Sequence, residues 1–187
     1  MTLLLSLPFR LQHGAGFSPS EVGAAIAPWP LTTMVVAPLA GWLSDRYPAG
    51  LLGGIGMAVA TGGLVALALL PADPAWIDIA WRMAITGAGF GMFLSPNACL
   101  IVGSAPRERA AAAGGLISTT RMVGQTTGAT LVAALLALGL GAGRAPALVA
   151  AGLAVIAGLC SLARLRPAIR NPAAAETDDA QPGEQVR

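Results

Sequence analysis

Residues 145–163 have the sequence APALVAAGLAVIAGLCSLA, in which one serine is the most polar side chain and no residue is charged. A helix rises 1.5 Å per residue, so about 20 such residues cross the roughly 30 Å hydrocarbon core of a bilayer. The whole chain agrees: of its 187 residues, 55% are hydrophobic and 11% are charged, and the mean hydropathy is +0.70. A soluble domain carries roughly 25% charged residues, and disordered chains are poor in aliphatic side chains. The composition therefore excludes both classes and predicts a membrane protein.

Four more stretches are long enough to span a bilayer and are uncharged, or are interrupted only by Arg121: residues 22–44, 48–72, 83–106 and 110–143. Residues 1–9 are apolar but reach only half a bilayer, and Arg10 ends them. A signal peptide would carry its positive charge before the apolar stretch, so we interpret this segment as the outer half of a helix that begins before the given sequence. The predicted fold class is an all-α, polytopic transmembrane helix bundle, with about five full helices and a truncated first helix.

Arginine counts in the short loops predict the orientation, because cytoplasmic loops carry the excess of basic residues. One side would carry Arg10, Arg144 and at most Arg82. The other side, which we expect to be cytoplasmic, would carry Arg46, Arg107, Arg109, Arg164, Arg166 and Arg170. Residues 1–165 would then form the helical part, and residues 166–187, rich in Pro, Ala, Gln and acids, a disordered cytoplasmic tail.

The loop after the first full span, GWLSDRYP over residues 41–48, places an acid beside a base at a helix end. Asp45 can accept hydrogen bonds from N–H groups at a neighbouring helix start, and Arg46 can bridge to another acid. Such contacts would pin adjacent helices together. The alternative is a solvated turn that contributes only to the positive-inside bias, and the residues alone favour neither interpretation.

The span that includes Met83 carries small residues and a helix breaker. Gly87 and Gly91 form a small-xxx-small pair that lets another helix approach closely. Pro96 removes a backbone hydrogen bond and bends the helix, and Asn97 lies beside that bend. Helix packing alone explains these residues; the alternative is a flexible gate that faces a cavity, with freed carbonyl groups near Asn97.

The strongest local pattern lies in the span from Ala110. Small and polar residues recur there at helical spacing and share one face: Gly114, Ser118, Arg121, Gln125 and Gly128. Arg121 would lie about 15 Å into the helix, where an arginine costs roughly 2.5–3.5 kcal/mol. We therefore expect this face to look into the bundle or a wet cavity. Alternatively, the helix starts late and Arg121 snorkels to the headgroups. Gly124 and Gly128 add a second close-packing pair.

No pattern of catalytic or metal-binding residues accompanies these spans. The one histidine is His13, and Cys99 and Cys160 lie far apart in apolar runs, without metal or redox spacing. Neither a hydrolase constellation nor a nucleic-acid motif occurs in the sequence. We therefore expect a protein that is not an enzyme, without metal, cofactor or nucleic-acid partner.

The order of these motifs resembles the major facilitator superfamily. The pattern Gly41-x-Leu43-Ser44-Asp45-Arg46 is similar to that family's loop signature after a second helix. The glycine-rich span with Pro96 follows it, then a short loop over residues 106–109. The string STTRMVGQTTG over residues 118–128 is similar to the fourteen-helix drug/proton antiporter branch. The resemblance covers roughly residues 1–165; one departure is Ala49-Gly50-Leu51-Leu52, where the signature usually has a basic pair.

The resemblance implies the C-terminal half of a secondary transporter in a bacterial inner membrane, with its C-terminus in the cytoplasm. It implies proton-coupled efflux of drug-like or amphipathic organic compounds by alternating access, in which two halves rock around a midplane site. The loop residues Gly41, Asp45 and Arg46 would be the gating loop. The substrate-cavity candidates are Asn97, Ser118, Arg121 and Gln125, and the packing or kink residues are Gly87, Gly91, Pro96, Gly124 and Gly128.

The implied partners are the lipid bilayer, a small organic substrate, protons, and either the N-terminal half, which holds the usual proton-coupling acids, or a second copy of the chain. The alternative is a truncated, non-transporting membrane fragment or a helix-bundle interaction module, which the half-helix over residues 1–9 favours. The reading frame upstream of Met1 would distinguish the two.

Overall fold

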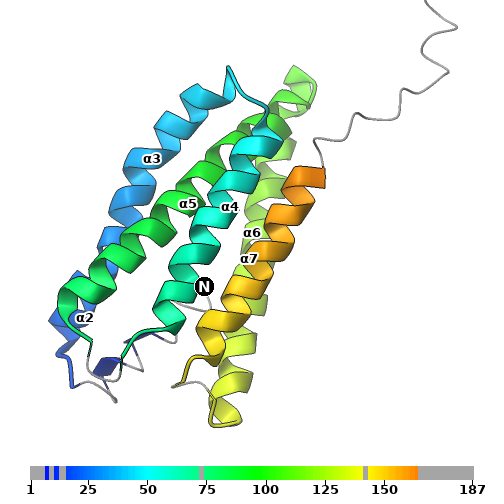
Figure 1. Cartoon of the computed structure of the whole chain (residues 1–187). Helices are drawn as coiled ribbons and strands as arrows, with labels where there is room; N and C mark the ends of the chain where they lie inside the picture. Colours follow the sequence, from blue (N-terminus) through cyan, green and yellow to red (C-terminus); the bar gives the residue numbers. More distant parts are fainter. Residues whose placement is uncertain (1–6, 9–10, 13–15, 72–73, 141–142, 164–187) are drawn as a thin grey trace, which may run out of the picture.

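The computed structural model describes residues 7–8, 11–12, 16–71, 74–140 and 143–163. Its regular structure is helical throughout those residues. Most of the half-helix expected over residues 1–9 lies outside them, as do His13, Asp73 and the tail 166–187. The helices are α2 (Pro19–Ile26), α3 (Pro28–Ser44), α4 (Ala49–Ala68), α5 (Trp76–Gly103), α6 (Ala110–Ala137, after a 3₁₀ turn at Arg107–Arg109) and α7 (Ala145–Ala163) (Figure 1).

Four helical segments are long and apolar enough to cross a membrane: Pro19–Ser44, Ala49–Ala68, Trp76–Gly103 and Ala145–Ala163. The expected all-helical, polytopic architecture is therefore confirmed for the described residues. The fifth expected span, α6, has 28 residues and is long enough at about 42 Å. It is not among the four because Arg121, Gln125 and a series of threonines make it more polar.

Two helices begin earlier than uncharged runs predict. α2 starts at Pro19 because Ser18 and Glu21 form a capping box, in which the Ser18 N–H donates to Glu21 Oε2 at 2.8 Å. α5 starts at Trp76 and includes Arg82. Arg82 Nη1 donates to the Asp78 carbonyl at 2.6 Å and lies 3.2 Å from Asp78 Oδ1. A charge that is paired costs less free energy to place in the membrane than an unpaired one. The span of α5 therefore includes Arg82 and does not begin after it.

The core is a row of helices in which α5 packs between α3 and α4, and α4 packs in turn against α7 (Figure 1). Glycines bring α4 and α5 into backbone contact: a methyl group added to Gly56 would lie 2.7 Å from the Gly89 carbonyl oxygen. A methyl group on Gly89 would overlap the backbone of Gly56 and Ala60. These two helices therefore approach each other more closely than side chains would allow.

The other two interfaces of the row follow the same pattern. On the α3 side, Thr32 Oγ1 donates to the Ala84 carbonyl at 3.0 Å, and Gly91 lies against Val36. On the α7 side, buried Ser161 donates its hydroxyl hydrogen to the Gly50 carbonyl at 3.2 Å. The opposite side of α7 exposes apolar residues such as Ile156 and Leu159, as expected of a peripheral, lipid-facing helix.

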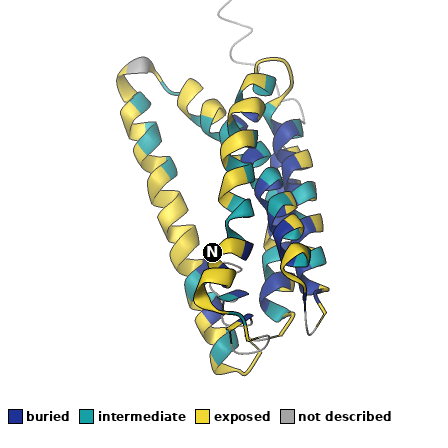
Figure 2. Cartoon of the chain, turned by 90° about the vertical axis from the view of Figure 1, so that its left-hand side faces the viewer, coloured by how far each residue is buried: buried dark blue, intermediate teal, exposed yellow. Residues whose placement is uncertain are grey.

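α6 makes few contacts with this row. Gly128 and Val132 are its buried residues, and most of the rest of the helix is exposed (Figure 2). Large apolar side chains such as Leu116 and Met122 are about two-thirds exposed, at 64% and 66%. A helix of this composition needs another surface beside it or lipid around it.

Candidate functional site

Arg121 lies near the middle of α6, eleven residues after the helix begins at Ala110 and thus about 17 Å along it. The structure therefore does not show the late helix start that the snorkelling alternative assumed. The side chain is exposed, and among the described residues neither a hydrogen bond nor an ion pair is formed by it. A cation at this depth gains most from water or a polar partner.

Ser118 and Gln125 lie on the same exposed side of α6 as Arg121. They are three residues before it and four after it, so the three side chains fall within roughly 60° around the helix axis. Arg121 also precedes the buried Gly128 by seven residues, which is nearly two full turns. The side of α6 that packs against the helix row at Gly128 thus carries the exposed side chains of Ser118, Arg121 and Gln125 in the turns before it.

The remaining cavity candidate, Asn97, lies on α5 and is more buried than the candidates on α6. Pro96 is fully buried within it, and Asn97 directly after it is half-buried. A six-residue connection, residues 104–109, joins α5 to α6. The structure thus places Asn97 and Arg121 on consecutive helices, with Asn97 in the half of α5 nearer to α6 along the chain.

The packing glycines fall into two groups. Gly87 and Gly91 lie against α3: the hydroxyl of Thr33 donates to the Gly87 carbonyl at 2.9 Å, and a methyl group on Gly87 would overlap Trp29 and Thr32. By contrast, Gly124 of α6 has no other segment within 4 Å of where a methyl group would lie. The close-packing pair of α6 is therefore half covered, at Gly128 alone.

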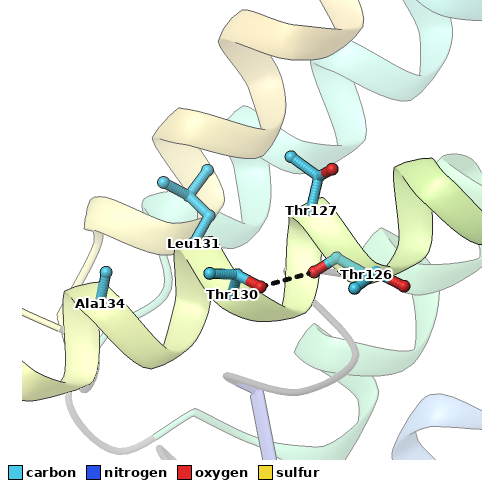
Figure 3. A pocket seen from close by; sticks show the side chains of 5 residues that line it. All are labelled: Thr126, Thr127, Thr130, Leu131 and Ala134. Atoms are coloured by element: carbon cyan, nitrogen blue, oxygen red, sulfur yellow. Dashed lines mark hydrogen bonds between the residues drawn. The ribbon is translucent and has the colours of Figure 1, made fainter.

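Sequence reasoning missed a second polar side of α6. Thr126, Thr127 and Thr130 line a hollow of about 400 Å³ together with Leu131 and Ala134 (Figure 3). Each of these hydroxyls donates to the carbonyl four residues earlier, at 2.8–3.0 Å. Their hydrogens are thus engaged, while their lone pairs remain available as acceptors. The signal in the sequence was the spacing of the threonines, which places them on one side.

The gating-loop candidates lie where α3 ends. Asp45 caps the helix end and is exposed, and Gly41 lies against Ser95 of α5. The guanidinium of Arg46 lies over the Trp42 ring, 4.5 Å from its centroid. Within the described residues, Arg46 thus makes a cation–π contact and no bridge to an acid.

The expected grouping of loops is visible at the ends of the bundle. The α3–α4 loop, the α5–α6 connection and the end of α7 lie at one end, uppermost in Figure 1. Among the described residues, no group of three side chains could hold a metal ion. Cys99 and Cys160 are exposed free thiols.

Comparison with known proteins gives a consistent family. The chain matches the Major Facilitator Superfamily over residues 1–185. It is 53% identical over 136 residues to the uncharacterized transporter YebQ of Escherichia coli, which covers 73% of this chain and 30% of that protein. It is 32% identical over 121 residues to the riboflavin transporter RibZ of Clostridioides difficile, covering 65% of this chain and 26% of the relative.

A third relative is named for multidrug resistance. The multidrug resistance protein Stp of Mycobacterium tuberculosis is 30% identical over 140 residues, which cover 75% of this chain and 26% of that protein. The chain thus spans less than a third of the length of these relatives. From its family match and its membrane-spanning helices, the chain belongs to the major facilitator superfamily of transporters, as a bacterial multi-pass membrane protein.

Proposed function

We propose that this chain forms the C-terminal half of a secondary transporter that exports drug-like or amphipathic organic compounds in exchange for protons. Membership of a transporter family supports the transport class. The name of the Mycobacterium relative supports the drug-like substrate, while the Clostridioides relative is named as a riboflavin transporter. The bacterial inner membrane is the expected location, with the C-terminus in the cytoplasm.

The observation that carries the proposal is the uncovered polar side of α6. Ser118, Arg121 and Gln125 are exposed there at mid-length, in a chain whose other long helices are apolar. An arginine in contact with lipid tails at this depth would cost roughly 2.5–3.5 kcal/mol, and a wet pathway removes that cost. In the proposed transporter these side chains, with Asn97 of α5, line the central cavity and donate hydrogen bonds to the substrate.

The gating loop has a mechanical role in this proposal. Gly41, Asp45 and Arg46 lie at or directly after the end of α3; Gly41 contacts Ser95 of α5, and Asp45 borders a hollow together with the last turns of α5. Alternating access requires the two halves of such a transporter to rock about the substrate site. The loop would hold the ends of α3, α4 and α5 together, so that this half moves as a unit.

The test uses both the chain by itself and a fusion in which it replaces the matching segment of the Escherichia coli relative. Proteoliposomes with the fusion should expel a cationic dye when a proton gradient is imposed, and an uncoupler should abolish the efflux. Proteoliposomes with the chain alone should show no such flux, because one half cannot enclose a midplane site. A fusion that is inserted and folded but inactive towards drug-like dyes would contradict the proposed substrate class.

A helix-bundle module that does not transport is the second candidate. The exposed length of α6 favours it, since that helix leaves most of its surface free for a partner. Saturable, gradient-dependent flux through the chain alone would contradict this candidate and require a dimer in which two copies face each other.

A further inference from the structure

The membrane-spanning segment Pro19–Ser44 is divided into α2 and α3 at Ala27. The backbone of Ala27 is itself helical, with φ −52° and ψ −34°, so the chain does not turn away there. Two prolines follow, and because Pro28 and Pro30 have no N–H, neither can donate to the carbonyl four residues earlier. Two of the backbone hydrogen bonds that would join α2 to α3 are therefore missing.

Among the described residues, the backbone hydrogen bonds at this junction pass through Ala27. Its N–H donates to the Gly23 carbonyl of α2 at 3.0 Å, and its carbonyl accepts from the N–H of Leu31 in α3 at 3.3 Å. The second distance lies just beyond the usual range for such bonds. Within the described part of the chain, Ala27 supplies no side-chain cap to α3. One residue thus connects the two helices, and a change in its backbone angles would swing one helix against the other.

The first turns of α3 are fixed to α5. The hydroxyls of Thr32 and Thr33 lie 3.0 and 2.9 Å from carbonyl oxygens of α5, and they also bond to carbonyls of their own helix. The ring of Trp29 lies edge-on to that of Phe90, with 6.1 Å between the centroids. A methyl group on Gly87 would overlap the Trp29 backbone, so the two helices are in close contact there. α3 is therefore held to α5 directly after the junction, by directional hydrogen bonds as well as by packing.

α2 is held by apolar contacts instead. It lies beside the start of α5 (Figure 1), and its buried residues Val22 and Ala25 belong to the same apolar cluster as Ile79 of α5. In the part of the chain that the structure describes, no side-chain hydrogen bond joins α2 to α5; the side chains at its start bond to one another. Apolar contacts have no preferred direction. α2 can therefore lift from α5 without breaking a hydrogen bond between the two helices.

The start of α2 is stabilised within the helix itself. The Ser18 N–H donates to Glu21 Oε2 at 2.8 Å, and the Glu21 N–H donates to Ser18 Oγ at 3.4 Å. This capping box does not depend on α5, so α2 can stay helical when it moves. Just before it, the Phe17 N–H donates to the carbonyl of the buried Leu11 at 3.1 Å. That bond ties Leu11 to the start of α2.

We propose that Ala27 is a hinge, and that α2 is a lid that swings about it while α3 stays on α5. Leu11, bonded to the start of α2, swings with the lid. The structure shows the closed position, in which Val22 and Ile79 are both buried. In the open position these apolar side chains become accessible at the end of the bundle where α5 begins. The motion does not depend on which compound the whole protein transports.

The experiment measures how fast a maleimide reagent modifies Val22→Cys in the full chain. The background lacks both native cysteines, and reconstitution in nanodiscs leaves both membrane faces open to the reagent. Pro28→Ala combined with Pro30→Ala should slow the reaction roughly tenfold, because two restored backbone hydrogen bonds then oppose opening. Ala27→Gly should speed the reaction roughly fivefold, because glycine weakens the helical connection at the hinge.

Pro38→Ala is the matched control, since it makes the same replacement inside α3 and should leave the rate at Val22→Cys unchanged. Ala40→Cys, at a buried position of α3, is the control reporter and should react at the same rate in every hinge variant. Equal rates at Val22→Cys in all hinge variants would overturn the proposal. Parallel changes at Ala40→Cys would also overturn it, because the whole bundle would then be loosened. So would changes in the same direction from the proline and glycine variants, because α2 would then be displaced in both.

Discussion

The hydroxyl of Thr33 in α3 donates to the carbonyl oxygen of Gly87 in α5, at 2.9 Å, and also to the Trp29 carbonyl of its own helix at 2.9 Å. The glycine allows the approach, because a methyl group in its place would overlap Trp29 and Thr32. Gly87 thus places no side chain in the interface, and Thr33 on the other helix supplies a hydrogen bond across it. Apolar spans without a hydrophobic driving force between them associate through contacts of this kind.

Thr33→Val should therefore weaken the association of α3 with α5. The expected loss is about 0.5–1 kcal/mol of unfolding free energy, the size of a hydrogen bond between membrane helices. Thr126→Val is the control, since that hydroxyl donates within its own helix, to the Met122 carbonyl at 3.0 Å. Unfolding by sodium dodecyl sulfate in mixed micelles measures both, and equal losses would show that the bond to Gly87 contributes nothing.

Gly89→Ala should be more damaging, because its methyl group would overlap the backbone of Gly56 and Ala60. Overpacking of this kind costs about 1–3 kcal/mol. Gly62→Ala is the matched control: nothing lies within 4 Å of its added methyl group, and alanine is the better helix former by about 1 kcal/mol. The two variants should shift the thermal unfolding midpoint in opposite directions. Similar shifts would contradict the contact between α4 and α5.

The orientation of the chain is testable by cysteine labelling in intact cells. In a variant that lacks Cys99 and Cys160, an impermeant maleimide added from outside should modify Asp73→Cys and spare Glu108→Cys. The reason is the arginine excess on the loop that carries Glu108. The reverse pattern of labelling would place the C-terminus outside the cell.

Arg121→Ala should impair drug efflux by the full-length fusion while its amount in the membrane stays near normal. Arg121→Lys should restore only part of the activity, because an ammonium cannot reproduce the planar fork of the guanidinium. Arg144→Ala, just before α7 and exposed, is the control for loss of an arginine. Normal efflux by Arg121→Leu would remove Arg121 from the cavity lining.

The helices could be predicted because the bilayer imposes a length and an apolar composition on each. Their starts were harder: Arg82 was counted as a break, but its bonds to Asp78 and its stacking on Trp81 at 4.5 Å let α5 include it. Such contacts depend on where each side chain points, and counting the charged residues in a sequence does not predict that direction. The family could also be recognised, because its motifs keep their order.

The candidate site was predictable only in part. The spacing of Ser118, Arg121 and Gln125 correctly placed them on one side of a helix, since that follows from the helical repeat alone. The hollow beside Thr126 and Thr130 was not predicted, because three-dimensional shape decides which threonines border a hollow. Whether these side chains touch a substrate stays a prediction.

The glycine contacts of α4 have a mechanical consequence. Its backbone meets that of α5 on one side, while Ser161 and Leu162 of α7 fill the space beside its glycines on the other. Packed helices can slide past each other when the side chains between them change conformation. Glycines in backbone contact have no side chain that could do so. We therefore expect α4 and α5 to move as one rigid unit. The flexible helix would then be α6, because it makes few contacts with the other helices and can tilt without breaking many of them.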